Sequence, residues 1–350
     1  MNISELKKLS ELPLLELVER AHAVHVRHWD PTRIQICTLL SIKTGGCSEN
    51  CAYCAQSARH GAVPSTALVP KALVLERALL AKATGATRFC MGAAWRGIRA
   101  EDPRFADVLE MVQAVRALGL EVCATLGKIG PAEARALKDA GLTAYNHNLD
   151  TSPERYADIV STHTYDDRLQ TIDAVQQAGI SLCCGGILGL GEAPQDRLRL
   201  LEIVSSFPTP PESFPINVLI PIPGTPLGEA TPEPPDPLDL LRMVALARIA
   251  LPRTRVRLSA GREHMSEEAQ LLCFYAGANS LFYGDKLLTA HNASIEQDRR
   301  LLERAGLRPE LPHASTLAPA SAEGQGGAPA ANPFGDDEPH PCYRPGPCRG

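Results

Sequence analysis

The sequence contains no run of about 18 uncharged apolar residues, so it predicts no membrane span. Its lysines and arginines are scattered rather than clustered, and the net charge is −5. A basic stripe of the kind that binds nucleic acid is therefore absent. The opening segment, MNISELKKLSELPLLELVERAH, lacks the apolar centre of a signal peptide and is typical of a charged amphipathic helix. These absences argue against a membrane or nucleic-acid partner and favour a cytoplasmic protein.

Cysteine, in contrast, is plentiful, with 11 residues in 350. In a reducing compartment disulfides are rare, and cysteines there are usually metal ligands, catalytic thiols or small core residues. Cys342 and Cys348 fall in a Gly-, Pro- and Ala-rich segment without apolar periodicity. We predict that residues 309–350 form a disordered tail and interpret its two thiols as free, with metal binding as the alternative.

The middle of the chain alternates strand patterns with helix patterns. Strands are expected at Arg33–Lys43, Thr87–Trp95, Leu120–Leu126, Thr143–Asp150, Ile180–Gly191, Ser213–Ile222, Thr254–Glu263 and Ser280–Leu288. Helices are expected at Asp107–Leu118, Pro131–Ala140, Asp166–Ala178, Asp196–Ser206, Leu238–Leu251 and Glu267–Ala276. Eight strand–helix units predict an α/β fold, a (β/α)8 TIM-type barrel over residues 33–308, with an N-terminal helical extension over residues 1–32. An open doubly wound sheet is the alternative.

The loop after the first expected strand carries three closely spaced cysteines, Cys47, Cys51 and Cys54, in a C-x3-C-x2-C pattern. Three thiolates can hold a [4Fe–4S] cluster and leave one iron open for the amino and carboxylate groups of S-adenosylmethionine (SAM). Structural zinc sites prefer four ligands in paired C-x2-C arrangements, and only His60 lies near enough in sequence to be a fourth. The loop also follows the carboxyl end of a strand, where barrel enzymes place their chemistry.

A second group of cysteines lies on the strands themselves. Each of the expected second, third and fifth strands has a cysteine as its fourth residue: Cys90, Cys123 and Cys183. The three should therefore lie at a similar height, with their side chains on the same face of the sheet, the barrel interior. This pattern favours a second metal cluster over ordinary packing of small core residues. The other cysteines are interpreted as buried packing residues: Cys37, Cys184 and Cys273.

Polar residues alternate on the fourth expected strand. Asn146, Asn148 and Asp150 stand at i, i+2 and i+4, which points all three into the barrel. Inward polar groups need partners, and two amides with one carboxylate suit a ribose diol and a cyclic urea.

Long stretches of the chain, up to about residue 308, are similar to the biotin synthase family of radical-SAM enzymes: GGCSENCAYCAQSARH, TRFCMGAAW, YNHNLDTSPE, GGILGLGE, PTPPESFPIN, VRLSAGRE and AGANSLFYGDKLLT. The resemblance implies a homodimer of barrels that inserts sulfur between C6 and C9 of dethiobiotin, the last step of biotin biosynthesis. It also implies a SAM-binding [4Fe–4S] cluster, a deeper [2Fe–2S] cluster that supplies the sulfide, a 5′-deoxyadenosyl radical and an external one-electron reductase.

The resemblance also assigns roles to residues. Cys47, Cys51 and Cys54 would hold the [4Fe–4S] cluster, and Cys90, Cys123, Cys183 and Arg257 the [2Fe–2S] cluster. Tyr53, Asn148, Asp150 and Ile187 would contact SAM, and Asn146, Asn148, Asn217 and Thr289 would contact dethiobiotin. Read without the resemblance, an inward arginine such as Arg257 would pair with an anion. Ala290 stands where the family commonly has a second threonine, which weakens the expected carboxylate contact.

Two other functions are compatible with a cysteine-rich barrel. A different radical-SAM enzyme, such as a mutase or a maturase, would be expected to lack the set Cys90, Cys123, Cys183 and Arg257. A non-enzymatic iron–sulfur carrier would need neither an open iron nor the polar row on the fourth strand.

Overall fold

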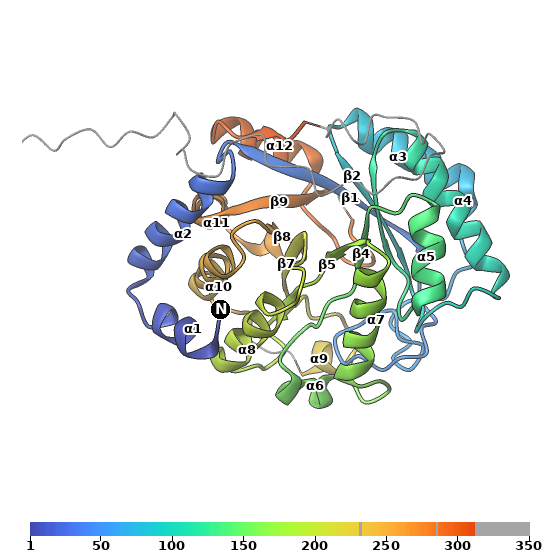
Figure 1. Cartoon of the computed structure of the whole chain (residues 1–350), viewed down its shortest axis with the longest axis horizontal. Helices are drawn as coiled ribbons and strands as arrows, with labels where there is room; N and C mark the ends of the chain where they lie inside the picture. Colours follow the sequence, from blue (N-terminus) through green and yellow to red (C-terminus); the bar gives the residue numbers. More distant parts are fainter. Residues whose placement is uncertain (231–232, 285, 312–350) are drawn as a thin grey trace, which may run out of the picture.

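Strand β1 (Arg33–Lys43) pairs with β2 on one side and with β9 on the other, and the second pairing closes a parallel barrel. The computed structural model describes residues 1–230, 233–284 and 286–311 (Figure 1). The other barrel strands are β2 (Arg88–Ala93), β3 (Glu121–Thr125), β4 (Ala144–Asn146), β5 (Ser181–Cys183), β6 (Gly186–Leu188), β7 (Ser213–Val218), β8 (Arg255–Leu258) and β9 (Ala278–Tyr283). Closure rules out the open doubly wound sheet and confirms the barrel.

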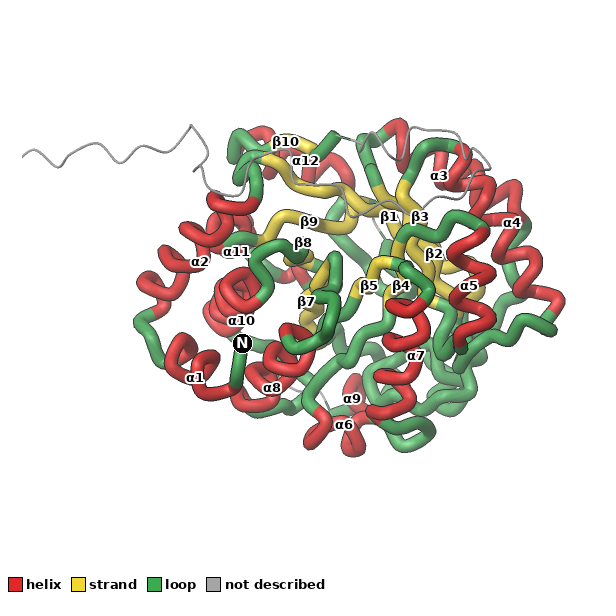
Figure 2. The backbone as a smooth tube through the Cα atoms, viewed as in Figure 1, coloured by secondary structure: helices red, strands yellow, loops and turns green. Residues whose placement is uncertain are grey.

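Helices surround the strands, as the tube view shows (Figure 2). They are α1 (Ile3–Ser10), α2 (Leu14–His28), α3 (Lys71–Ala83), α4 (Pro103–Ala117), α5 (Pro131–Asp139), α6 (Pro153–Ile159), α7 (Tyr165–Gln177), α8 (Pro194–Ser205), α9 (Pro226–Glu229), α10 (Pro237–Ala250), α11 (Glu267–Ala276) and α12 (Ile295–Arg304), with a 3-10 turn η1 (Arg262–His264). Their apolar sides pack on the outward faces of the strands in one continuous core. None of the helices in the described residues is long and apolar enough to cross a membrane.

The N-terminal extension forms α1 and α2, which pack against α8, α10 and α11. Helix α1 begins with a capping box, because the Asn2 side chain accepts from the Glu5 backbone and Glu5 accepts from the Asn2 backbone. At the other end, β10 (Arg308–Pro309) pairs with the start of β1, so the ordered chain passes residue 308, where we placed the end of the barrel unit. The tail beyond residue 311, with Cys342 and Cys348, lies outside the described residues.

An ion network closes the amino-terminal end of the barrel. Arg88 binds Glu121 and Glu212 at 2.7 and 2.6 Å. Arg255 in turn binds Glu212 and Glu310 at 2.8 and 2.7 Å. Burial would raise the pKa of Glu212, but the two arginines outweigh it and lower that pKa to about 2. The described end of the chain thus helps to seal the barrel beneath its interior.

A buried ion pair attaches α12 to the barrel. Arg262 holds Asp298 through two contacts of 2.6 and 2.5 Å, and both side chains are almost fully buried. We expect Asp298→Asn to lower the free energy of unfolding by about 3 kcal/mol, because it leaves the buried Arg262 charge uncompensated. Glu296→Gln, which removes an exposed pair with Arg299 on the same helix, is the matched control and should change it by less than about 0.5 kcal/mol. Anaerobic urea titration of the iron-loaded chains measures both, and equal effects would contradict the prediction.

Candidate active site

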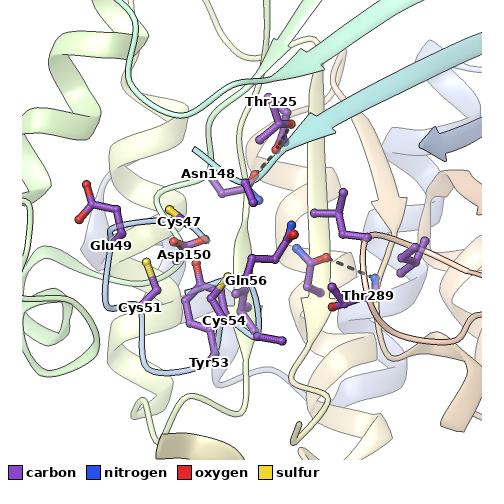
Figure 3. Close-up of a pocket in the computed structure, with 18 of the residues that line it drawn as sticks. Cys47, Glu49, Cys51, Tyr53, Cys54, Gln56, Thr125, Asn148, Asp150 and Thr289 are labelled. Carbon is purple, nitrogen blue, oxygen red and sulfur yellow. Dashed lines mark hydrogen bonds between the residues drawn. The ribbon is translucent and has the colours of Figure 1, made fainter. Parts of the chain in front are cut away.

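A cavity of about 340 Å³ opens at the carboxyl ends of the barrel strands. The three loop cysteines lie on one side of it, with Tyr53 and Asp150 among them, and Thr289 lies across the pocket (Figure 3). Of the residues predicted to contact ligands, all line this cavity: Tyr53, Asn146, Asn148, Asp150, Ile187, Asn217 and Thr289. Such a concave site at this end of a barrel is where barrel enzymes bind their substrates.

The cysteine loop is held in shape by its own backbone. Cys47 N–H donates to the Gln56 carbonyl at 2.9 Å, and Cys54 N–H donates to the Cys51 carbonyl at 2.9 Å. Gly45 and Gly46 precede the first cysteine with φ of 64° and 72°, a region that glycine adopts without strain. Together these contacts bring three cysteines of one short loop to the pocket wall.

Burial raises the pKa of the loop thiols, for Cys54 to about 11. A thiolate there therefore requires a compensating positive charge, which iron supplies. In the described residues, no three Cys, His, Asp or Glu side chains are placed to hold a single metal ion. The zinc alternative, with His60 as a ligand, is therefore not supported: the His60 ring lies 3.1 Å from the Cys51 carbonyl oxygen. Ligands to different irons of one cluster need not converge on one point, so the loop fits a cubane better than a single ion.

A hydrogen-bonded carboxylate lies beside the loop. Tyr53 Oη donates to Asp150 Oδ2 at 2.8 Å, and Arg168 Nη2 lies 3.3 Å from the same oxygen. Burial raises the pKa of Asp150, while Arg168 and Tyr53 act in the opposite direction. Arg168 was missed from the sequence because it stands on α7 without a motif of its own.

Arg168 also joins a second group of polar side chains. Its Nε donates to Tyr156 Oη at 2.8 Å, and that hydroxyl contacts the His163 ring at 2.8 Å. His163 lies 2.9 Å from Glu49, a loop residue between two of the cysteines. Burial would raise the pKa of Glu49, but hydrogen bonds with Thr162 and His163 outweigh it and lower that pKa. The network therefore couples the cysteine loop to α6 and α7.

The fourth and fifth strands break where the sequence predicted continuous strands. Strand β4 ends at Asn146, and the fifth strand divides into β5 and β6 at residues 184–185. The Asn148 side chain accepts the Gly185 N–H at 3.1 Å. Asp150 has a φ of 67°, outside the strand region. The expected strand alternation beyond Asn146 is therefore wrong, although Asn146, Asn148 and Asp150 do all reach the pocket.

Gly185 has no room for a side chain. A Cβ there would lie 1.9 Å from the Pro215 carbonyl oxygen, so β5 and β7 would have to separate. We expect Gly185→Ala to lower the free energy of unfolding by about 2 kcal/mol through overpacking. In Gly130→Ala the nearest atom is a side-chain carboxylate oxygen of Glu133 at 3.1 Å, and this control should stay within about 1 kcal/mol. Urea titration of both variants measures the difference in their free energies of unfolding. If the two variants were equally stable, β5 and β7 would separate at little cost and the prediction would be wrong.

The strand thiols lie below the pocket, buried in the barrel. Cys90 and Cys123 are register partners on β2 and β3, as predicted, so the two residues lie directly beside one another. The neighbouring Cys90 thiol lowers the pKa of Cys123. Cys183 is paired with Asn146, two residues beyond the level of Cys123, because parallel strands in a tilted barrel are staggered. The three thiols thus lie on the expected face, with Cys183 offset by two residues in strand register from Cys123.

Arg257 joins this lower group. Its guanidinium lies 3.6 Å from Cys183 Sγ, and Nε donates to Ser280 Oγ at 2.9 Å. Asn146, which lines the pocket above, donates to Cys183 Sγ at 3.3 Å. Asn146 therefore links the upper cavity with the lower thiols. As interpreted from the sequence, Cys184 and Cys273 pack in the outer core rather than in the barrel interior.

The remaining residues that were predicted to contact SAM or dethiobiotin line another part of the pocket wall. Asn217 donates to the Gly186 carbonyl at 3.1 Å and accepts the Ala260 N–H at 3.3 Å, so its amide joins two neighbouring strands. Ile187 and Thr289 line the pocket, and Ala290 lies there too without a hydroxyl. The wall thus offers few polar groups among many apolar ones.

Two family models match the chain. The Radical SAM superfamily matches residues 41–204, and the Biotin and Thiamin Synthesis associated domain matches residues 215–308. The first range contains the six cysteines of the two groups, and the second contains Asn217, Arg257 and Thr289. The pocket is therefore built from both matched regions.

Curated relatives cover nearly the whole described chain. A biotin synthase from Myxococcus xanthus is 54% identical over 312 residues, covering 89% of each chain. One from Synechococcus elongatus is 57% identical over 305 residues, covering 87% of this chain and 94% of its own.

Among solved structures, methylornithine synthase (PylB) has a TM-score of 0.74 at 20% identity, covering 88% of this chain and 94% of its own. HydG, a maturase of the [FeFe]-hydrogenase, has a TM-score of 0.76 at 18% identity, covering 91% of this chain and 74% of its own. At these identities the likeness concerns the fold alone.

Proposed function

The chain belongs to the biotin synthase family of radical-SAM enzymes, and on that premise we propose that it converts dethiobiotin to biotin by inserting sulfur between C6 and C9. SAM and iron–sulfur chemistry belong to this family. The contacts of the two thiol groups support a finer assignment of residues to each cluster.

We assign a [4Fe–4S] cluster to Cys47, Cys51 and Cys54. When bound, this cluster supplies the electron that cleaves SAM to methionine and a 5′-deoxyadenosyl radical. Three ligands from one short loop leave one side open to the pocket, where the amino and carboxylate groups of SAM can bind. Asp150 and Asn148 present a carboxylate and an amide suited to a ribose diol, and Tyr53 and Ile187 border the same space.

We assign a [2Fe–2S] cluster to Cys90, Cys123, Cys183 and Arg257. When bound, it supplies the sulfide that becomes the ring sulfur of biotin. The position of the lower group supports this assignment, since it lies directly under the substrate pocket, and a sulfur donor must lie close to the carbon that it attacks. The arginine and three thiols are also shielded from solvent, which protects a reactive radical from water.

The pocket between the groups suits dethiobiotin. Asn146 and Asn148 hydrogen-bond to one another at 3.1 Å, and their amides can instead engage the ureido ring. Asn217 and Thr289 border the opposite side, with Thr289 as the hydroxyl for the carboxylate. Leu39, Phe282 and Leu287 supply the apolar surface for the alkyl chain.

The observation that carries the proposal is the stacking of two cysteine groups at two depths of one barrel. Its test is anaerobic reconstitution with iron and sulfide, followed by an assay with dethiobiotin, SAM and a one-electron donor that scores biotin and 5′-deoxyadenosine together. We expect both products, and Mössbauer spectra with a [4Fe–4S] and a [2Fe–2S] component. A chain that holds one cubane and makes no biotin would refute the proposal.

The partners and the compartment are proposed from the same family membership. An external one-electron reductase would reduce the upper cluster, and two chains would form a homodimer. The cytoplasm suits a protein whose nine described cysteines are all free thiols. Light scattering of the reconstituted chain tests the dimer, since a mass near that of one chain would contradict it.

A further inference from the structure

Within the described part of the chain, the ligand sets proposed above leave out one interior thiol, that of Cys37. It stands two residues before Leu39 on β1, so both side chains point into the barrel. Cys37 is fully buried and belongs to the same packed group as Cys90 and Cys123. The sequence suggested only a packing role, and its contacts point to another.

Cys37 and Arg257 share their polar neighbours. Gln35 Oε1 lies 3.2 Å from Arg257 Nη2 and 3.5 Å from Cys37 Sγ. Ser280 Oγ lies 2.9 Å from Arg257 Nε and 3.7 Å from Cys37 Sγ. Two groups that contact the same two oxygens lie side by side. Because the guanidinium also reaches Cys183, Arg257 is flanked by two thiols.

We propose that Cys37 is a reserve ligand of the lower cluster, which takes the iron position of Arg257 when the arginine leaves it. This inference rests on the proposed assignment of the [2Fe–2S] cluster to Cys90, Cys123 and Cys183. In the exchange an Fe–N bond breaks and an Fe–S bond forms, while the thiol proton passes to the departing guanidine. No electron is transferred. Thiolate is the softer ligand and the one that iron–sulfur clusters ordinarily use, so the exchange keeps iron in place.

Four reconstituted proteins test the proposal: the unaltered chain, Arg257→Ala, Cys37→Ser and the double variant. The measurement is the rate at which an iron chelator removes the [2Fe–2S] component, followed by Mössbauer spectroscopy under anaerobic conditions. In each single variant, we expect the chelator to remove that component at a rate within about threefold of the rate for the unaltered chain. In the double variant, we expect removal to be at least about tenfold faster. The Fe–S stretching bands of Arg257→Ala in resonance Raman spectra should be those of a cluster with four cysteine ligands.

Arg257→Ala combined with Cys273→Ser is the matched control, because Cys273 is equally buried but lies in the outer core. It should behave as Arg257→Ala does, and an intact [4Fe–4S] component shows that each variant has folded. Equal rates for Arg257→Ala and the Arg257→Ala/Cys37→Ser variant would overturn the inference while leaving the proposed function intact. An unaltered chain without any [2Fe–2S] component would overturn both.

Discussion

Replacing Cys183 with alanine should lower biotin formation by roughly a hundredfold or more while 5′-deoxyadenosine is still produced. Loss of even an outer-shell partner of a metal site typically lowers affinity or activity 10–100-fold, so loss of a direct ligand should do at least as much. Cys183 contacts Asn146 and Arg257, neither of which belongs to the cysteine loop, so its removal leaves the proposed [4Fe–4S] ligand set in place. The loop of Cys47, Cys51 and Cys54 keeps its ligands, and SAM cleavage should continue without productive sulfur transfer.

Cys184→Ala is the control for this experiment, because it changes the adjacent thiol, which packs in the outer core. It should keep biotin formation within a few-fold of the unaltered chain, since it removes a buried sulfur without touching either ligand set. The ratio of biotin to 5′-deoxyadenosine, measured in one anaerobic assay, separates the two variants. If Cys183→Ala formed biotin at the unaltered rate, the sulfur-donor assignment would be wrong.

The barrel could be predicted from the sequence because its signals are local and periodic. Most strands contain a short run of buried apolar residues, and several helices end at a glycine in the left-handed region, such as Gly119, Gly141 and Gly179. The cysteine groups could be predicted for the same reason, since a loop spacing and a strand parity are both visible in one dimension. The two-residue register offset of Cys183 from Cys123 could not, because the stagger between strands depends on barrel tilt.

The polar networks were missed because their members are distant in sequence. Glu49 and His163 meet across more than a hundred residues, and neither lies in a periodic segment. The ion network at the base left a usable signal, however. Arg88, Glu121 and Arg255 each stand two residues before a proposed ligand of the lower cluster, so strand parity already points them into the barrel below it.

The sequence indicates the early end of β4 and the division of the fifth strand only weakly. The sequence GGILGLGE contains several glycines, which a strand tolerates poorly, yet its apolar residues still suggested one continuous strand. What ends the pairing is a side chain, since Asn148 takes the Gly185 N–H that a continuous ladder would use. A competition between a side-chain acceptor and a backbone acceptor cannot be decided from propensity alone.

The second large effect is expected from Arg168→Gln, a variant of the residue that the sequence did not reveal. Removing this cation raises the pKa of Asp150 further, because burial already raises it and Arg168 is the largest opposing influence. Less of the Asp150 carboxylate is then ionised at neutral pH, which weakens its proposed hydrogen bond to SAM. The KM for SAM should rise by roughly 10–100-fold, the effect expected from loss of one hydrogen bond to a charged group.

The pH dependence of this defect identifies its cause. Since deprotonation restores the carboxylate, the KM of Arg168→Gln should fall back towards the unaltered value as the pH is raised. Arg168→Lys keeps a positive charge and should show a smaller shift in the same direction. The measurement is the KM for SAM, from initial rates of 5′-deoxyadenosine formation, over a pH series in all three proteins. A deficit of the same size at every pH would mean that Arg168 acts by direct contact with the ligand rather than through Asp150.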